Sequence, residues 1–386
     1  MMKQFFTLVF LSFIFFANAG NTPITLSGFN ADVVANGIGA ATASTTHDVD
    51  SAGYALIAPD YKLLSTSTAP TVFLPASGLI NSFATAGLSF QLAGYGGLND
   101  LRLQTNSSGT LTFGTPTSAA VIYVLGFSGT GSSTATITVR FSDNSTQVFT
   151  NVNFNDWYNG SGYAITNVGR VTRSTGVTDL AGTTGPRLYQ VPLALSSSNY
   201  SKQIVSVDVT RTGGSALGSM LNIMAITTSD ATFPGGGYTI NNAQPTAGSN
   251  YASFNEAITA LSSGAITGAV TFTVAPGSGP YSEKISIAPV IGASSTNRVT
   301  FNCNGVTMAY NTTDLNNRTA IILNGADFIT IDSLNVDVSA GTYGWGIVLT
   351  GGADSNIIRK CTVLTNKIAT TTNYMGIVLN GSATTT

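Results

Sequence analysis

The chain has 386 residues, of which 43% are hydrophobic and only 8% are charged, and its formal net charge at pH 7 is −2. Disordered chains combine low hydrophobicity with high net charge, so this composition excludes a largely disordered protein. Fifteen Lys and Arg against seventeen Asp and Glu form no basic surface, so we expect no nucleic-acid partner. Thr, Ser, Asn and Gly must build the surface instead, which is typical of β-strands joined by tight turns.

Residues 1–19 have the pattern of a secretory signal peptide. Lys3 gives a positive charge near the start, residues 5–16 form an apolar run, and Ala17, Asn18 and Ala19 make a small-x-small cleavage site. The apolar run is about twelve residues long, which is too short for a helix across about 30 Å of hydrocarbon. We therefore expect a secreted or cell-surface protein whose mature chain has no membrane span, with a retained anchor as the alternative.

Residues 20–230 alternate short apolar runs with polar turns, which predicts a β-sandwich domain. Residues 119–126 form one continuous apolar run, as in a strand buried on both faces, whereas residues 134–141 alternate strictly. Further strands are predicted at residues 147–154, 188–195, 203–210 and 220–227. This spacing without a helical period favours an antiparallel sandwich. We expect a jelly-roll-like domain, and an immunoglobulin-like sandwich is the alternative.

Residues 231–237 are predicted to be a linker, because Pro234 is followed there by three glycines. Ser253 and Glu256 then form a capping box, in which the hydroxyl and the carboxylate satisfy exposed amides at a helix start. One short helix is expected after Ser253, ending near Gly264. Its buried face would consist of Phe254, Ala257, Ile258 and Leu261. Strands are predicted next at residues 268–274, 283–287 and 298–303.

A short motif recurs in the last part of the chain. Residues 320–325, 346–351 and 376–381 read AIILNG, GIVLTG and GIVLNG, and residues 329–336 (ITIDSLNV) correspond to residues 356–363 (NIIRKCTV). A period of this length indicates a repeat architecture. Because each repeat holds strands and no helix, we expect each to form one coil of a parallel β-helix, with like strands about 4.8 Å apart. Asp332 and Arg359 would then form an ion pair between consecutive coils.

Several segments of the second half carry a family resemblance. They are residues 238–240 (YTI), the predicted helix, and residues 270–277 (VTFTVAPG), 281–283 (YSE), 285–287 (ISI) and 297–301 (NRVTF). Together they resemble the start of pectin-lyase-like right-handed β-helices, closest to those in large surface proteins of Bacteroidetes-type bacteria. The resemblance covers residues 238–386 and implies a right-handed coil whose N-terminal end is covered by the helix. Independently, an uncovered end would expose edge strands to aggregation.

The first domain is similar, more loosely, to jelly-roll modules of secreted bacterial proteins. Residues 139–145, 154–157 and 187–190 carry this likeness, which implies carbohydrate binding. The expected fold class is therefore all-β. It consists of an antiparallel jelly-roll-like sandwich, followed by the start of a right-handed parallel β-helix with an N-terminal capping helix, over residues 20–230 and 238–386.

The β-helices in question include polysaccharide lyases, pectin esterases and polygalacturonases, so catalysis has to be considered. Hydrolysis of a glycosidic bond needs paired carboxylates, and lyase chemistry needs a calcium cage and a basic residue. Charged residues in the repeated coils are few: Asp327, Asp332, Asp337, Asp354, Arg359 and Lys360. The only histidine, His47, belongs to the first domain. We assign no catalytic residue and expect these side chains to be structural.

Five residues of the sandwich are candidates for carbohydrate binding: Asp156, Trp157, Tyr158, Tyr163 and Arg170. Aromatic faces can stack on the C–H groups of sugar rings, while Asp and Arg bind sugar hydroxyls. Tryptophan is also common in sandwich cores, so a structural role is the alternative. The loop of Tyr95, Asn99 and Asp100 is a weaker candidate.

No metal and no cofactor are expected. His47 lies in a polar loop beside Asp48 and Asp50, which supply too few ligands for a zinc-type site, whereas calcium bound by oxygen ligands is left open. Cys303 and Cys361 lie about two coils apart. Strand stacking separates such positions by about 9.6 Å, beyond the ~7 Å limit for a disulfide, so two free thiols are predicted.

The function expected from these features is non-catalytic. The chain would be a secreted or cell-surface adhesion protein that displays the sandwich on a β-helical stalk and binds polysaccharide or a cell-surface glycan. A polysaccharide lyase or glycoside hydrolase acting in the β-helix groove, with the sandwich as an accessory binding module, is the alternative, and a structural spacer is the third. Because no covering element follows Gly376, we expect the chain to continue in a longer polypeptide.

Overall fold

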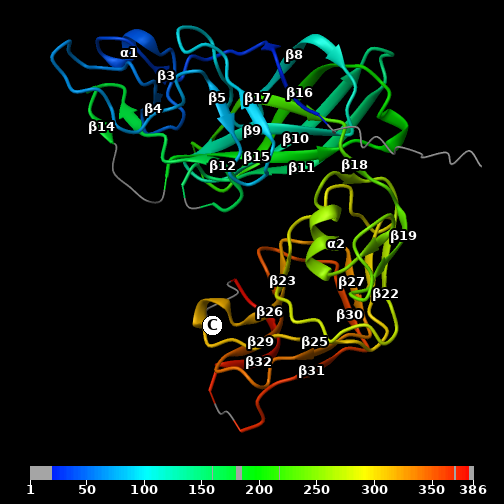
Figure 1. Cartoon of the computed structure of the whole chain (residues 1–386). Coiled ribbons are helices and arrows are strands. Elements are labelled where there is room, and N and C mark those ends of the chain that lie inside the picture. The colour runs from blue at the N-terminus through cyan, green and yellow to red at the C-terminus, as the bar shows by residue number, and fades with distance from the viewer. Residues whose placement is uncertain (1–19, 159, 180–184, 217, 369–370, 382–386) are drawn as a thin grey trace, which may run out of the picture.

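The computed structural model describes residues 20–158, 160–179, 185–216, 218–368 and 371–381 (Figure 1). The described chain is almost entirely β-structure, with antiparallel sheets in the first part and a parallel β-solenoid in the second. This confirms the expected fold class. Within the described residues, no helix is long and apolar enough to cross a membrane. The expected signal peptide, residues 1–19, lies outside the described residues.

Two antiparallel sheets form the sandwich. The central sheet has the order β1 (Asn21–Ile24), β17 (Met220–Ser229), β9 (Val121–Gly129), β15 (Arg187–Ala194) and β12 (Tyr163–Thr166), and β7 (Leu101–Leu103) also pairs with β17. The outer sheet has the order β11 (Thr146–Phe154), β10 (Ser133–Phe141), β16 (Ile204–Gly214), β8 (Ser108–Thr117) and β2 (Leu26–Ser27). A 3-10 turn, η1 (Ser197–Asn199), follows β15.

The burial of β9 and β10 agrees with their sequence patterns. All nine residues of β9 are buried, because its strand has a hydrophobic core on each face. In β10 the alternating side chains Ala135, Ile137, Val139 and Phe141 are buried against the central sheet. The remaining strands predicted in the sandwich are confirmed as β11, β15, β16 and β17.

A third layer covers the free face of the central sheet. It contains the sheet β14 (Thr178–Asp179), β13 (Arg170–Thr172), β4 (Tyr54–Ile57) and β3 (Val34–Ala35), the hairpin β5 (Leu79–Asn81) and β6 (Ser89–Gln91), and the helix α1 (Ala41–Ser44). The core beneath it joins Val34, Leu56 and Phe90 to Leu125 and Phe127 of β9. The first unit is therefore thicker than the two-sheet sandwich that the sequence predicted.

The solenoid is built from three parallel sheets. The long sheet contains β20 (Asn250–Tyr251), β19 (Gly236–Ile240), β22 (Val270–Val274), β24 (Val299–Asn302), β27 (Ile329–Asp332) and β30 (Ile357–Arg359). The middle sheet contains β23 (Ile285–Ile287), β26 (Thr319–Asn324), β29 (Gly344–Thr350) and β32 (Tyr374–Leu379), and a 3-10 turn, η2 (Leu315–Asn317), precedes β26. The short sheet contains β25 (Thr307–Ala309), β28 (Asn335–Asp337) and β31 (Thr362–Leu364).

The repeated motif stacks as the sequence predicted. Ile321 pairs in parallel with Ile347, which pairs with Ile377 on the next coil. The second repeated segment behaves in the same way, since Asp332 of β27 pairs with Arg359 of β30. Aligned aliphatic side chains thus form continuous ladders inside the coils, and each coil buries its apolar face against its neighbours.

The predicted helix is α2 (Phe254–Leu261), and it lies at the end of the solenoid that faces the sandwich (Figure 1). The Ser253 hydroxyl accepts a hydrogen bond from the Glu256 amide at 3.1 Å, which confirms the capping box. Phe254, Ala257 and Leu261 pack into the solenoid core, as expected for an apolar helical face that closes a stack of coils.

The segment predicted as a linker, residues 231–237, contains regular structure. β18 (Thr232–Phe233) pairs in parallel with β21 (Ala265–Ile266), and the first two residues of β19, Gly236 and Gly237, pair with β22. The three glycines therefore lie in or beside strands. The backbone of Gly235 also passes close to Gly268, since a Cβ atom added to Gly235 would lie 2.7 Å from the Gly268 Cα. The glycine run reflects close backbone packing here, not a free tether.

Candidate functional site

The predicted carbohydrate cluster of the sandwich is only partly at the surface. Trp157 is 2% exposed and stacks on Phe127, with ring centroids 5.7 Å apart. Its indole belongs to the core between the central sheet and the covering layer. Trp157 therefore offers no open ring face to a sugar. Its position matches the alternative given for it above, a structural tryptophan in the sandwich core.

Three neighbouring candidates, Asp156, Tyr158 and Arg170, make contacts within the protein. The Arg170 guanidinium lies 3.8 Å from the centre of the Tyr54 ring and 5.0 Å from that of Tyr158, and it donates to Asp179 at 2.9 Å. Asp156 accepts hydrogen bonds from the backbone amides of Tyr158, at 2.9 Å, and of Gly131. Burial raises the pKa of the Tyr158 hydroxyl. These contacts occupy the charges of Asp156 and Arg170.

Tyr163 belongs to a different and more open arrangement. Its ring stacks on Phe83 with centroids 5.3 Å apart and planes 18° apart, and the Arg187 guanidinium lies 4.9 Å from its centre. Phe83 is 79% exposed, although large aromatic side chains are usually buried. The Phe83 amide donates to the Ala164 carbonyl at 2.9 Å, which fixes the loop. We refer to Phe83 and Tyr163 as the aromatic platform.

Phe83 was not among the residues selected from the sequence. Its local signal is a single aromatic residue in a loop of Ser, Ala, Thr and Gly, at residues 82–87, between two short strands. Such an isolated residue is ambiguous, because an apolar side chain in a loop is as often buried under it as exposed. The pairing with Tyr163, eighty residues later in the chain, arises only on folding.

The weaker loop candidate is structural. Asn99 and Asp100 are fully buried, and Asn99 donates to the Asp32 carboxylate at 2.7 Å. The Tyr95 hydroxyl donates to the Pro75 carbonyl at 2.6 Å. Burial raises the pKa of Asp100 well above its ordinary value, and both its oxygens lack a hydrogen-bond partner among the described residues.

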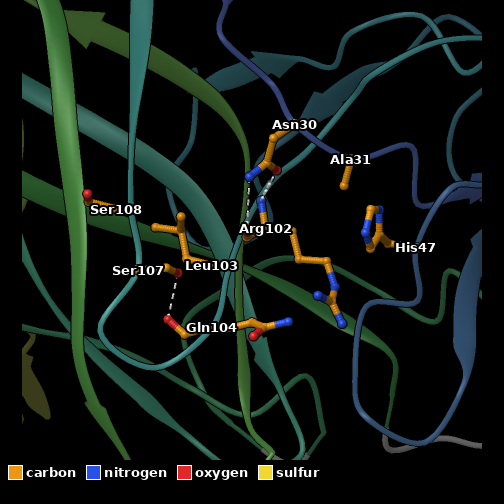
Figure 2. A pocket seen from close by; sticks show the side chains of 8 residues that line it. All are labelled: Asn30, Ala31, His47, Arg102, Leu103, Gln104, Ser107 and Ser108. Atoms are coloured by element: carbon orange, nitrogen blue, oxygen red, sulfur yellow. Dashed lines mark hydrogen bonds between the residues drawn. The ribbon is translucent and has the colours of Figure 1, made fainter.

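His47 lines a small pocket of about 260 Å³ at the edge of the central sheet (Figure 2). On one wall, the Asn30 side chain accepts a hydrogen bond from the Arg102 backbone amide at 2.8 Å and donates one to the Arg102 carbonyl at 3.0 Å. The Arg102 guanidinium is paired with Asp48 at 2.5 Å. His47 is exposed, with its Nδ1 3.1 Å from the Thr46 hydroxyl, so the pocket holds no free pair of charged groups.

No group of three or more His, Cys, Asp or Glu side chains gathers into a metal-binding cluster within the described residues. Cys303 and Cys361 are unbridged, as predicted. Cys303 is buried inside the coils, and burial raises the pKa of its thiol. A buried protonated thiol is a poor nucleophile, so Cys303 acts as a core residue.

Polar side chains follow one another along the outer face of the long sheet. Thr273, Asn302, Asp332 and Arg359 stand in register on β22, β24, β27 and β30. Their neighbours in sequence, including Phe272, Phe301 and Ile331, point into the core instead. We call these four residues the polar row. At the strand spacing of parallel sheets it extends over about 14 Å.

Asp332 is the central charge of the polar row. It is 9% exposed, and its carboxylate accepts from the Ser333 hydroxyl at 2.8 Å and from Arg359 at 2.8 and 2.9 Å. The hydrogen bond from Ser333, with a further contribution from Arg359, holds the pKa of Asp332 below its ordinary value. The ion pair predicted from the repeat is confirmed, and Asp332 is ionised at neutral pH.

No protein-family model matches the chain, and no curated protein matches it. Among solved structures, a variant of the GH87 alpha-1,3-glucanase catalytic domain in complex with tetrasaccharides is 13% identical over 90% of this chain, with a TM-score of 0.24. A second variant, in complex with nigerose, is 11% identical over 94% of this chain, also at 0.24. The Agl-KA catalytic domain is 10% identical over 72% of this chain, at 0.23. This chain spans 61%, 62% and 57% of the lengths of those three structures.

These matches correct one interpretation of the sequence. Non-catalytic display on a stalk was the expected function, and it is contradicted, because the matched structures are catalytic domains of alpha-1,3-glucanases. Their low identities and TM-scores assign no residue of this chain a role, so any role has to come from its own geometry. The resemblance to pectin-lyase-like proteins holds at the level of a β-solenoid.

Proposed function

We propose that this chain serves a glycoside hydrolase that acts on a neutral polysaccharide along the outer face of the solenoid. The observation that carries the proposal is the polar row, in which a nearly buried, ionised Asp332 lies among Thr273, Asn302 and Arg359. Hydroxyl and amide side chains exchange hydrogen bonds with sugar hydroxyls. The only charges of the row neutralise each other, which favours a neutral polymer over a uronate.

Asp332 has the properties of one of the two carboxylates that hydrolysis requires. One carboxyl group protonates the departing glycosidic oxygen, and the other, ionised, activates water or attacks the sugar. Its lowered pKa fits Asp332 to the second role. The two groups must lie about 5–9.5 Å apart.

The sandwich would serve as the accessory binding module. The aromatic platform supports this role, because the exposed Phe83 ring can stack on a pyranose ring while Tyr163, itself in contact with Arg187, supports it. Among the five candidates from the sequence, Tyr163 is thus the one that we retain for sugar contact. The signal-peptide pattern supports an extracellular location, where polysaccharide is met.

The test is the release of reducing ends from neutral polysaccharides by the whole chain. α-1,3-Glucan is the first substrate to try, since the matched structures are alpha-1,3-glucanases, followed by α-1,4-, β-1,3- and β-1,4-glucans. Asp332→Asn keeps the size of the side chain and removes its charge. We expect it to lower kcat by at least about a hundredfold, as for loss of a group that acts in proton transfer.

Asp354→Asn is the matched control, because Asp354 is an exposed carboxylate one coil away and outside the polar row. It should leave hydrolysis unchanged. Phe83→Ala should weaken retention on insoluble glucan without changing kcat on short oligosaccharides. Hydrolysis by Asp332→Asn at the wild-type rate would refute the role of the polar row, and a wild-type chain inert on every glucan would refute the proposed function.

A further inference from the structure

The junction between sandwich and solenoid is a continuous packed interface. The Ala231 carbonyl accepts from the Ala265 amide at 3.0 Å, and β18 pairs with β21 beside it. Ala265 and Ile291 of the solenoid pack into the core beneath the covering layer of the sandwich. Figure 1 shows β18 lying where the two units meet. The walls of any cavity at this junction are therefore held at a fixed distance.

A pocket of about 340 Å³ lies at this junction, lined on one side by residues 149, 192–197 and 200 and on the other by residues 266–267, 292–294 and 297. Its volume falls in the range of about 300–1,000 Å³ that ligand pockets occupy, and junctions between units are a preferred place for them. Among the described residues, no Asp, Glu, Lys, Arg or His side chain lines it. A charged ligand would find no counter-charge there, so the pocket suits a neutral one.

The sandwich wall combines apolar, aromatic and hydroxyl side chains. It includes Phe149, Leu193 and Tyr200, the last of which follows the turn η1, and also Ser196 and Ser197. Gln147 fixes this turn, because its Oε1 accepts from the Ser196 amide at 2.9 Å and from the Asn199 side chain at 2.8 Å. Tyr200 thus follows a turn that hydrogen bonds hold in place, whereas Phe149 lies on β11. Both side chains therefore lose little conformational entropy when they contact a ligand.

The solenoid wall carries polar side chains, and a hydrogen bond also holds its loop in place. The Ser294 hydroxyl accepts from the Asn297 amide at 3.0 Å, which holds the loop that carries the Asn297 side chain. Gly292 has φ +85°, and a Cβ there would lie 2.8 Å from the Ile266 carbonyl oxygen, so only glycine fits this turn without strain. The loop therefore keeps one conformation beside Ile266.

Two polar groups of the pocket have no protein partner. Within the described residues, neither the Tyr200 hydroxyl nor the Asn297 side-chain amide makes a hydrogen bond, although both side chains are half-buried. The pocket thus combines aromatic and apolar side chains with hydroxyl and amide groups. A pyranose ring has the matching chemistry, with C–H groups on its faces and hydroxyls at its rim.

We propose that this junction pocket binds a sugar unit of a neutral glycan, separately from the polar row, with Tyr200 and Asn297 as its hydrogen-bonding residues. The class of ligand rests on the proposed function, whereas the position of the site does not. A second site on the same rigid body would retain the polymer beside the solenoid and raise its effective concentration at the polar row.

The test is calorimetric titration of the whole chain with neutral gluco-tetraoses of α-1,3, α-1,4, β-1,3 and β-1,4 linkage, with tri-galacturonate as the charged comparison. All variants carry Asp332→Asn, so that the ligands stay intact. Ser197→Trp places an indole into the pocket from the exposed turn, and Asn297→Ala removes the free amide. Thr66→Trp, on an exposed loop of the covering layer, is the matched control.

We expect Asn297→Ala to weaken binding of the preferred tetraose about tenfold, as for the loss of one well-made hydrogen bond. Ser197→Trp should reduce the number of tetraose molecules bound per chain by one, and Thr66→Trp should leave this number unchanged. Unchanged affinity in both pocket variants would overturn the inference of a junction site. If the wild type still hydrolysed glucan in that case, the proposed function would stand. Pocket-dependent binding by a chain without hydrolysis would overturn only the proposed function. Absence of binding to every tetraose would overturn the junction site.

Discussion

Individual residues show how little a side chain's type says about its use. Trp157 and Phe83 are both aromatic residues that follow a polar residue, yet Trp157 is 2% exposed and Phe83 is 79% exposed. Trp157 lies in the core between the central sheet and the covering layer, whereas Phe83 lies in the exposed loop that joins β5 and β6 of that layer. Asp100 is also fully buried, and its carboxyl group has no hydrogen-bond partner among the described residues.

Asp100 gives a prediction for stability against pH. Burial raises its folded pKa well above the unfolded value of about 3.9, with Arg102 opposing the shift only in part. The folded state therefore binds more protons than the unfolded state between these two pKa values. The free energy of unfolding should fall by up to about 1.4 kcal/mol per pH unit as the pH rises through this window.

Asp100→Asn removes this dependence. As the pH rises from 3.5 to 7, the free energy of unfolding of the variant should increase relative to that of the wild type. Urea denaturation at both pH values measures this difference. Asp230→Asn, at an exposed position in the same unit, is the control and should show no such difference. Parallel stability curves for Asp100→Asn and the wild type would contradict the assignment of a protonated, buried Asp100.

At the scale of elements, α2 depends on a residue from another coil. The Glu283 carboxylate accepts from the backbone amides of Phe254 and Asn255, at 3.1 and 2.9 Å, at the N-terminus of the helix. A carboxylate there satisfies unpaired amides and interacts favourably with the helix dipole. The capping box within α2 was visible in the sequence, whereas this contact spans 29 residues and was not.

Glu283→Ala should therefore lower the free energy of unfolding by about 1–2 kcal/mol, as for the loss of a helix cap. Glu283→Gln keeps an acceptor and loses the charge, so it should cost less than the alanine variant. The measurement is urea denaturation followed by circular dichroism. Ser282→Ala, at the exposed neighbouring position, should be neutral, and equal stabilities of all three variants would argue against the cap.

At the scale of the whole molecule, the sandwich and the solenoid share core residues. Ile291 and Ala265 of the solenoid contact the sandwich core, and the strands β18 and β21 join the two units. Units that share a core and a backbone hydrogen-bonded junction unfold together when the interface contributes much of the stability of each. The two tryptophans of the chain report on this separately, because Trp157 lies in the sandwich and Trp345 in the solenoid.

We expect both units to unfold in one transition. In the Trp345→Phe variant, fluorescence follows Trp157 alone, and in the Trp157→Phe variant it follows Trp345. The two fluorescence transitions in urea should each coincide with the circular dichroism transition of the same variant. Adding Ile291→Ala to each variant should lower both midpoints. A shift confined to the solenoid probe, or two separated transitions, would show that the units are energetically independent.

Local periodicity in the sequence determined much of this protein by itself. Alternation predicted β10, the recurring Ile, Val and Leu positions predicted the ladders through Ile321 and Ile347, and the spacing of Ser253 and Glu256 predicted α2. These features depend on neighbours within one strand, one helical turn or one repeat, so a linear pattern contains them. The ion pair of Asp332 and Arg359 followed from the same repeat.

Only the tertiary structure decided which layers and which distant segments pack against each other. A strand pattern shows that a face is buried, but not which layer buries it, so the covering layer, the burial of Trp157 and the exposure of Phe83 could not be read from the sequence. The junction has the same origin, since the glycine-rich segment after Pro234 looks like a free linker until its backbone is seen packed against Gly268. Contacts between distant segments are set by the summed packing of whole layers, which no local pattern encodes.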